Sequence, residues 1–213
     1  METGAAPPLD GEAEELQPSG LPAFRAHYVG GQLDGPLALF DEDGQLRQQS
    51  HYRAGVLHGL TVVQAAGVKL AEIPYLAGRM EGLVRTFAAD GGVSSAVAHV
   101  AGRPHGAAEY FHAGGQVARR AHYRAGMLDG EVRDYDETGV LLATTIYVAG
   151  KRHGVRTLWH ANGKARETVM FKADQPAGEL RRFDEQGQPA APPGQEPARR
   201  SLLSRLIEGG QNG

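Results

Sequence analysis

Histidines and carboxylates recur at one position along this sequence, and both residue types can hold a divalent cation. The position stands just before a glycine that returns about every 24 residues, and its occupants are Asp34, His58, Glu81, His105, Asp129, His153 and Ala177. If each period forms two short β-strands, occupants two periods apart lie four strands apart, about 19 Å at the usual strand spacing. Only adjacent histidine and acid pairs could meet, and they supply two ligands. We therefore expect no metal and no cofactor, and a solvated column whose charges pair weakly or make partner binding sensitive to pH.

Other catalytic patterns are missing from the sequence. It contains no Gly-x-Ser-x-Gly, no Walker-type loop and no His-Glu-x-x-His. It also contains no cysteine, which removes thiol nucleophiles, disulfides and Cys-ligated zinc. We expect that the chain is not an enzyme. The weaker alternative is an unrecognised histidine and aspartate site, which substitution of His105 and His153 would test.

A recurring aromatic column is the better candidate for function. Its members are Phe40, Phe87, Phe111, Tyr135, Trp159 and Phe183. Residues two positions earlier share a strand face with them, and these residues include Arg85, Glu109, Arg133, Thr157 and Arg181. Aromatic and arginine side chains dominate protein-interface hot spots. The predicted partner-binding residues are Phe87, Phe111, Arg133, Tyr135, Trp159, Arg181 and Phe183; the alternative is that the rings only stack along the sheet.

Both columns belong to one 24-residue unit, which is clearest in residues 121–144. Its skeleton is Tyr123, Gly126, Gly130, Tyr135 and Gly139. The first aromatic position recurs seven times, at Tyr28, Tyr52, Tyr75, His99, Tyr123, Tyr147 and Phe171. One step is 23 residues instead of 24, and the missing residue falls between Gly59 and Gly67, where we expect a turn. A fixed period of this length indicates a quasi-linear repeat array.

Each unit predicts two short antiparallel strands rich in β-formers. We expect the Gly-x-x-x-Gly stretch to be the tight turn of a hairpin, with its second glycines at Gly35, Gly59, Gly82, Gly106, Gly130, Gly154 and Gly178. An Asp-x-x-Gly element makes the second turn, and no helical period appears in this region. Small or β-branched residues two positions before the first aromatic should stack into a thin core, and they are Ala26, Ser50, Ile73, Val97, Ala121, Thr145 and Val169.

The predicted fold is therefore all-β: an elongated, curled antiparallel β-meander of seven 24-residue β-hairpin repeats, about fourteen strands, with a short C-terminal helix. Residues 21–189 hold the repeats. Residues 1–20 carry five acidic residues and no basic one, which predicts a disordered acidic arm. Residues 190–213 read as a proline-rich linker followed by an amphipathic helix over 198–208, which caps the sheet or else contacts a partner or a membrane.

Charge and the N-terminal sequence limit the possible partners and compartment. The net charge is −3, so the chain beyond the acidic arm carries about +2, and no basic stripe for phosphate binding stands out. Nucleic acid is therefore a poor candidate. With no secretory signal and no apolar span, we expect a cytoplasmic protein.

The skeleton, Tyr-x-x-Gly-x-x-x-Gly followed by an aromatic and Asp/Asn-x-x-Gly, resembles the MORN repeat, and more closely the bacterial MORN-variant repeats of YwqK-like antitoxin proteins. The resemblance covers all seven units, with departures at His99, Asp174 and Gln64. It implies a curled sheet with a concave face and a non-catalytic binding role. It further implies an antitoxin or immunity protein that occludes a protein toxin, including a secreted interbacterial effector. The alternative that it leaves open is a membrane- or lipid-associated scaffold.

Overall fold

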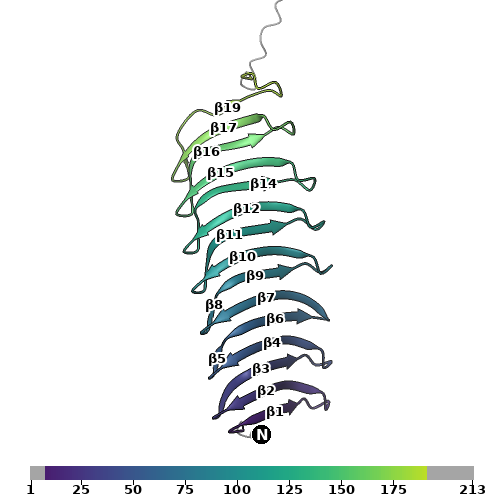
Figure 1. Cartoon of the computed structure of the whole chain (residues 1–213). Coiled ribbons are helices and arrows are strands. Elements are labelled where there is room, and N and C mark those ends of the chain that lie inside the picture. The colour runs from purple at the N-terminus through teal and green to yellow at the C-terminus, as the bar shows by residue number, and fades with distance from the viewer. Residues whose placement is uncertain (1–7, 191–213) are drawn as a thin grey trace, which may run out of the picture.

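The structure is a computed structural model that describes residues 8–190. Its strands form one antiparallel sheet in which each strand pairs with its neighbours in the chain, from β1 at one end to β19 at the other (Figure 1). The predicted all-β meander is confirmed. The predicted C-terminal helix, the amphipathic segment 198–208 and most of the proline-rich linker lie outside the described residues.

The strands in chain order are β1 (Gly11–Leu16), β2 (Pro22–Val29), β3 (Gln32–Phe40), β4 (Leu46–Arg53), β5 (Val56–Leu57), β6 (Gly59–Ala65), β7 (Val68–Leu76), β8 (Arg79–Met80), β9 (Gly82–Phe87), β10 (Val93–Val100), β11 (Arg103–Phe111), β12 (Val117–Arg124), β13 (Met127–Leu128), β14 (Gly130–Tyr135), β15 (Leu141–Val148), β16 (Lys151–Trp159), β17 (Ala165–Lys172), β18 (Gln175–Pro176) and β19 (Arg181–Arg182). Four of the two-residue strands, β5, β8, β13 and β18, are each followed by a break in the strand just before the second glycine of the repeat. Joining each to the strand that follows leaves β1 and the fourteen strands expected from seven repeats.

The hairpin turn occupies two residues, and the second glycine of Gly-x-x-x-Gly is not one of them. In the fifth repeat Arg124 pairs with Met127 around Ala125 and Gly126, whose φ angles are 51° and 89°. Two positive φ angles are what a type I′ turn requires, and its twist suits a two-residue hairpin. The prediction that Gly130 belongs to the turn is therefore wrong, because Gly130 begins β14 instead.

The second glycines lie at bulges where one strand has more residues than its partner. Val97 pairs with Ala108 and His99 pairs with Pro104, so β11 has extra residues around Gly106. Gly154 shows why glycine is needed: its φ is 107°, and an added Cβ would lie 3.3 Å from the Cβ of Ile146. The second glycine has φ between 100° and 112° in six repeats, and Gly178 in the last repeat does not share this conformation.

The Asp-x-x-Gly element forms the second turn, as predicted. In the first repeat the amide of Asp41 donates to the carbonyl of Gln45 at 2.9 Å, and its carboxylate accepts the amide of Gln45 at 2.8 Å. The 23-residue step shortens this turn to Ala66 and Gly67, flanked by the pair Ala65 and Val68. The prediction that the missing residue lies in a turn is confirmed.

The predicted small-residue column runs across the sheet at right angles to the strands. Ala26, Ser50, Ala121 and Thr145 are buried, and the column continues through the facing strands, where Thr61 donates a hydrogen bond to Ser50 at 3.1 Å. Its centre is a cluster of Ala108, Ala121 and Val132, with Val97, Tyr110, Tyr123, Leu128 and Tyr147 packed against it. The sheet is thus a single layer whose core is one residue wide.

Part of the predicted disordered arm is ordered. Gly11–Leu16 forms β1, which pairs with β2 so that Ala13 faces Ala26 and Glu14 faces Arg25. The carboxylate of Glu14 accepts a hydrogen bond from Arg25 at 2.7 Å, so a charge that argued for disorder is paired across strands. The prediction of disorder is wrong for residues 11–16.

Candidate binding faces of the sheet

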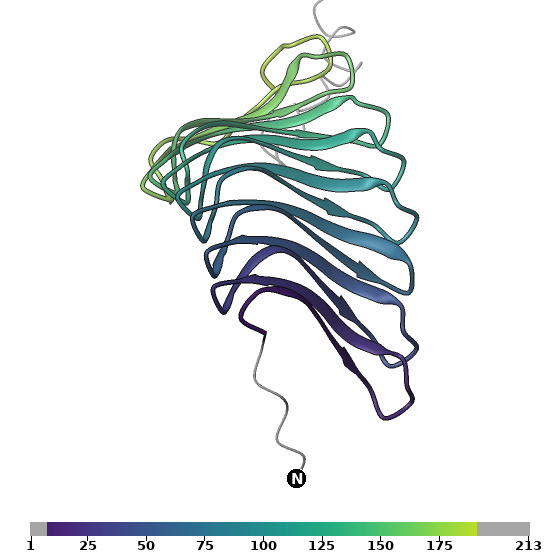
Figure 2. The same ribbon diagram turned by 60° about the horizontal axis from the view of Figure 1, so that its bottom comes forward.

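The two faces of the sheet differ in burial. We call the face that carries the small-residue column and the first aromatics the inner face, and the opposite one the outer face. Figure 2 shows that the strands bend, so that the sheet is curved across its width. Along β12 the inner residue Ala121 is buried, whereas its outer neighbours Arg120 and His122 are exposed.

Two tyrosines close over the small-residue column at its centre. Tyr110 and Tyr123 lie on adjacent strands on opposite sides of Ala108 and Ala121, and their hydroxyls share a hydrogen bond at 3.0 Å. Burial, and then the hydrogen bond with Tyr123, raise the pKa of Tyr110 to about 12. The inner-face side chains that flank the column therefore lean towards each other here and cover it.

The inner face changes character along the array. Its positions in β2 to β11 carry no Asp, Glu, Lys or Arg, and half-buried apolar side chains there include Phe24, Tyr28, Leu33, Leu37, Leu39, Tyr52, Leu57, Val63, Ile73, Tyr75, Met80 and Val84. From β12 onwards the same face carries charges. They are Arg119, Asp134, Arg152, Arg156, Glu167 and Arg182, with Asp174 at the last hairpin turn.

Most of these charges are paired. Arg119 donates to Asp134, and Arg182 donates to Glu167 at 3.3 Å. Arg156 occupies the small-residue column itself, facing Thr145 on one side and Val169 on the other. Four arginines thus meet three carboxylates on this part of the inner face, which leaves it with a positive excess.

The predicted partner-binding residues lie on the outer face, opposite the small-residue column. Arg120 stands 6.0 Å from the ring centroid of Tyr135, and the indole of Trp159 donates to the hydroxyl of Thr144 at 3.3 Å. Lys69 lies 5.2 Å from the ring centroid of Phe87. Phe111, Arg133 and Arg181 follow the same strand alternation, and Phe183 forms an isolated bridge with Pro189. Cations or hydroxyls from neighbouring strands thus contact three of these rings.

Ion pairs cross the outer face between neighbouring strands. Glu109 on β11 accepts from Arg120 on β12 at 3.0 Å, whereas Arg133 pairs with Glu131 along β14 itself. All four side chains are 39% to 56% exposed, so each pair contributes little stability. The outer face is a mixed, solvated surface on which the aromatic column is half-buried.

The histidine and acid column links one repeat to the next. The carboxylate of Asp34 accepts the amide of Ala54 at 3.0 Å, and Glu81 accepts the amide of Ala101 at 2.8 Å. His105 accepts the amide of Ala125 through Nδ1 at 3.4 Å. Each acceptor therefore holds the hairpin turn of the following repeat. This role escaped the sequence analysis, although Asp10, which holds Gly30 in the same way at 2.8 Å, stands 24 residues before Asp34.

A metal site is not formed by this column. Among residues 8–190 no three histidine or acidic side chains come together in a way that could hold a metal ion. His112 and His160 act elsewhere, since each donates its Nε2 proton to a carbonyl of the next repeat, Tyr135 at 3.0 Å and Phe183 at 2.9 Å.

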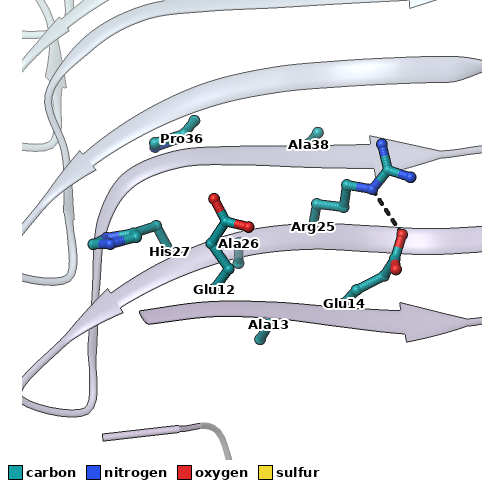
Figure 3. Close-up of a pocket in the computed structure, with 8 residues that line it drawn as sticks. All are labelled: Glu12, Ala13, Glu14, Arg25, Ala26, His27, Pro36 and Ala38. Atoms are coloured by element: carbon teal, nitrogen blue, oxygen red, sulfur yellow. Dashed lines mark hydrogen bonds and ion pairs between the residues drawn. The ribbon is translucent and has the colours of Figure 1, made fainter. Parts of the chain in front are cut away.

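A hollow of about 340 Å³ lies at the N-terminal end, across β1, β2 and β3 (Figure 3). Glu12, Glu14 and Arg25 border it with His27, whose Nδ1 donates to the carbonyl of Asp34 at 2.6 Å. The Glu14 and Arg25 pair crosses one side of the hollow (Figure 3). Of its four polar side chains, Glu14 and Arg25 are bonded to each other and His27 is bonded to the backbone.

Comparison with known proteins supports the repeat assignment. Residues 33–54, 104–125 and 128–149 match the family described as "MORN repeat variant". The chain is thus similar to MORN repeat variants over three stretches. They fall in the first, fourth and fifth units of the array, and MORN repeats suggest a repeat-based binding scaffold. No curated protein matches the chain.

Solved structures add no functional information. One match is S. aureus TarM, crystallised as a mutant in complex with Fondaparinux, alpha-GlcNAc-glycerol and UDP, at 13% identity and a TM-score of 0.28. It covers 68% of this chain, which spans 21% of the TarM chain. Among the described residues no helix is long and apolar enough to cross a membrane.

Proposed function

We propose that this chain is a non-catalytic scaffold that binds another protein along the inner face of its sheet. The observation that carries the proposal is the continuity of that face across all seven repeats. Its aromatic rings from Phe24 to Tyr147 are half-buried, so each keeps an accessible surface that a partner can cover, whereas Phe171 in the last repeat is buried. Aromatic side chains that bury large areas at low entropic cost are typical of binding surfaces.

The partner that we propose is a toxin or effector protein, which the chain neutralises by covering a surface that the toxin needs. The MORN repeat variants and the resemblance of the whole skeleton to repeats of antitoxin proteins support this choice. The charge pattern describes the partner further. An apolar strip would lie against the inner side of β2 to β11, and an acidic group would lie near Arg156.

The test begins with affinity capture of the partner from lysate of the native host, followed by expression of the captured protein in a heterologous bacterium. The proposal expects that the captured protein arrests growth when it is expressed alone. Co-expression of the wild-type chain should restore growth, and a Tyr52→Ala/Tyr75→Ala inner-face variant should fail to do so.

A matched control truncates two half-buried aromatics on the outer face, in a Tyr135→Ala/Trp159→Ala variant. This variant should rescue growth as the wild type does. Circular dichroism and thermal unfolding of both variants establish that they are folded. A captured protein without effect on growth, or rescue by both variants alike, would count against the proposal, and capture of lipid alone would favour the membrane scaffold instead.

A further inference from the structure

The hairpin turns of the seven repeats line one edge of the sheet, the left edge in Figure 1, where β5 and β8 are labelled. We call this the hairpin edge, and define it by the two residues that pair immediately before and after each two-residue turn. In five hairpins one member of the pair is a cation and the other is apolar. These pairs are Arg53 with Val56, Leu76 with Arg79, Val100 with Arg103, Arg124 with Met127, and Val148 with Lys151.

The cations form a row. The second to seventh repeats each contribute one, in the order Arg53, Arg79, Arg103, Arg124, Lys151 and Lys172, and all six are exposed. Because some cations precede the turn and others follow it, successive cations lie one to three strands apart, about 5–14 Å along the edge. The row is positively charged, whereas the chain as a whole has a net charge of −3.

The apolar partners are exposed as well. Val56 is 45% exposed and Leu76 52%, and the others fall between these values. Val56 and Met127 lean along the edge, because a Cβ added to Gly78 would lie 3.2 Å from Val56, and one added to Gly150 would lie 3.6 Å from Met127. The edge is therefore a strip in which exposed cationic and apolar side chains are interspersed. A strip of exposed apolar groups between charges marks a surface that contacts a partner.

Nearby carboxylates offset part of the charge of the row, although few of them pair with its cations directly. Asp34, Glu81 and Asp129 lie beside the edge, and their oxygens accept turn amides of the next repeat. Only Asp129 also pairs with a cation of the row within the described residues, at 3.3 Å from Arg124. Asp174 in the last turn is engaged by Arg152.

The opposite edge has the opposite sign. Its turns carry Asp41, Glu42, Asp43, Asp90, Asp136, Glu137, Asp184 and Glu185, against the single cation Lys164. Charge is thus separated across the width of the sheet. A charged partner would therefore be attracted to one edge and repelled by the other.

We infer that the hairpin edge is a second interaction surface, distinct from the inner face, and that it binds an acidic amphipathic helix of a protein partner. One turn of helix advances about 5.4 Å, close to the spacing of two neighbouring strands. Acidic residues one to three turns apart can therefore meet successive cations, while apolar residues between them cover the exposed Val, Leu and Met side chains. The apolar half of the strip favours such a helix over nucleic acid, whose phosphate backbone has no apolar groups to offer.

The test uses the full chain and a fluorescent synthetic helical peptide of about 28 residues with glutamate and leucine at heptad spacing. A peptide with lysine in place of each glutamate serves as its control. The proposal expects the acidic peptide alone to bind in fluorescence anisotropy, and the binding to weaken as salt rises. An Arg79→Glu/Arg103→Glu variant should weaken it by about tenfold or more, since a reversed charge also repels the peptide.

The matched control is an Arg47→Glu/Arg166→Glu variant, which makes the same change in net charge at exposed positions near the opposite edge. It should change the affinity by less than about twofold. Equal weakening by both variants, equal binding of the two peptides, or no binding of the acidic peptide up to about 1 mM would overturn the proposal. So would binding of phosphatidylserine vesicles or duplex DNA in its place.

Discussion

Asp174 accepts two hydrogen bonds from Arg152, one from its backbone amide at 3.0 Å and one from its Nε at 3.1 Å. Asp174 replaces the first glycine of the last repeat and keeps a positive φ of 70°. Arg152 stands where other repeats have Leu33, Leu57, Met80, Pro104 and Leu128. Its guanidinium also lies 4.2 Å from the ring centroid of Phe171. Arg152 and Asp174 both depart from the repeat pattern, and the two departures are linked because these residues bond to each other.

Removing the charge of Asp174 should cost stability only where the carboxylate is ionised. The backbone and side-chain hydrogen bonds from Arg152 lower the pKa of Asp174. A carboxylate with a lowered pKa stabilises the fold above its unfolded value of 3.8 and loses this effect as pH falls through the folded pKa. We expect Asp174→Asn to be less stable than the wild type at pH 7, by chemical denaturation, and equal to it in strong acid. A difference that persists there would contradict this assignment.

Tyr110 should ionise at unusually high pH because it is partly buried and because it shares a hydrogen bond with Tyr123. Its pKa is raised to about 12 from 10.0, so the neutral hydroxyl stabilises the fold below pH 10 and this contribution is lost as pH rises through 12. Tyr123→Phe removes the shared hydrogen bond, and we expect the pKa of Tyr110 to fall towards 10. Ultraviolet titration measures this as loss of the tyrosine that ionises at the highest pH. A Tyr52→Phe variant should keep the tyrosine that ionises at the highest pH. A wild-type titration without such a tyrosine would refute the prediction.

The bulge glycines can be tested by a matched pair of alanine substitutions. Gly154→Ala places a Cβ 3.3 Å from that of Ile146 at a φ of 107°, and we expect a loss of about 1–3 kcal/mol in the free energy of unfolding. Gly178→Ala occupies the same repeat position without a positive φ, with its Cβ 3.4 Å from that of Met170. It should lose clearly less. Equal losses in urea denaturation would show that the bulge geometry is not what requires glycine.

The alanines of the hairpin turns store backbone strain. Ala125 has a φ of 51°, and the equivalent alanines of five other repeats lie between 47° and 49°. Asparagine adopts this conformation more readily than alanine, so Ala125→Asn should raise the free energy of unfolding by about 0.5–1 kcal/mol. Ala107→Asn, at an exposed strand position, is the control and should give no gain. A loss at residue 125 would argue against a type I′ turn.

The period was sufficient to predict the direction and pairing of the fourteen strands of the seven repeats, because the repeated columns can stack only if each unit forms two strands. The column of Ala26 and Ala121 was predicted as core because the alternation of side chains along a strand determines on which face of the sheet each residue lies. The place of the turn was mistaken, since positive φ makes glycine equally suited to a turn and to a bulge. The pair Ala125 and Gly126 was the signal that separates them.

Other features needed the structure. β1 was missed because its glutamates suggested disorder, although Asp10 and Gly11 repeat Asp34 and Gly35 at a distance of 24 residues. The basic row on the hairpin edge was missed because the cation stands before the turn in some repeats and after it in others. Only pairing across the turn, as between Leu76 and Arg79, brings these positions together.

The central claim, that the inner face binds a protein partner, is tested most directly by quantitative affinity capture from native-host lysate with three baits. The baits are the wild-type chain, the inner-face variant Tyr52→Ala/Tyr75→Ala and the outer-face variant Tyr135→Ala/Trp159→Ala. We predict one stoichiometric protein partner with the wild type and the outer-face variant, and its loss with the inner-face variant. Retention by the inner-face variant with loss from the outer-face variant would contradict the claim and assign binding to the outer aromatic column.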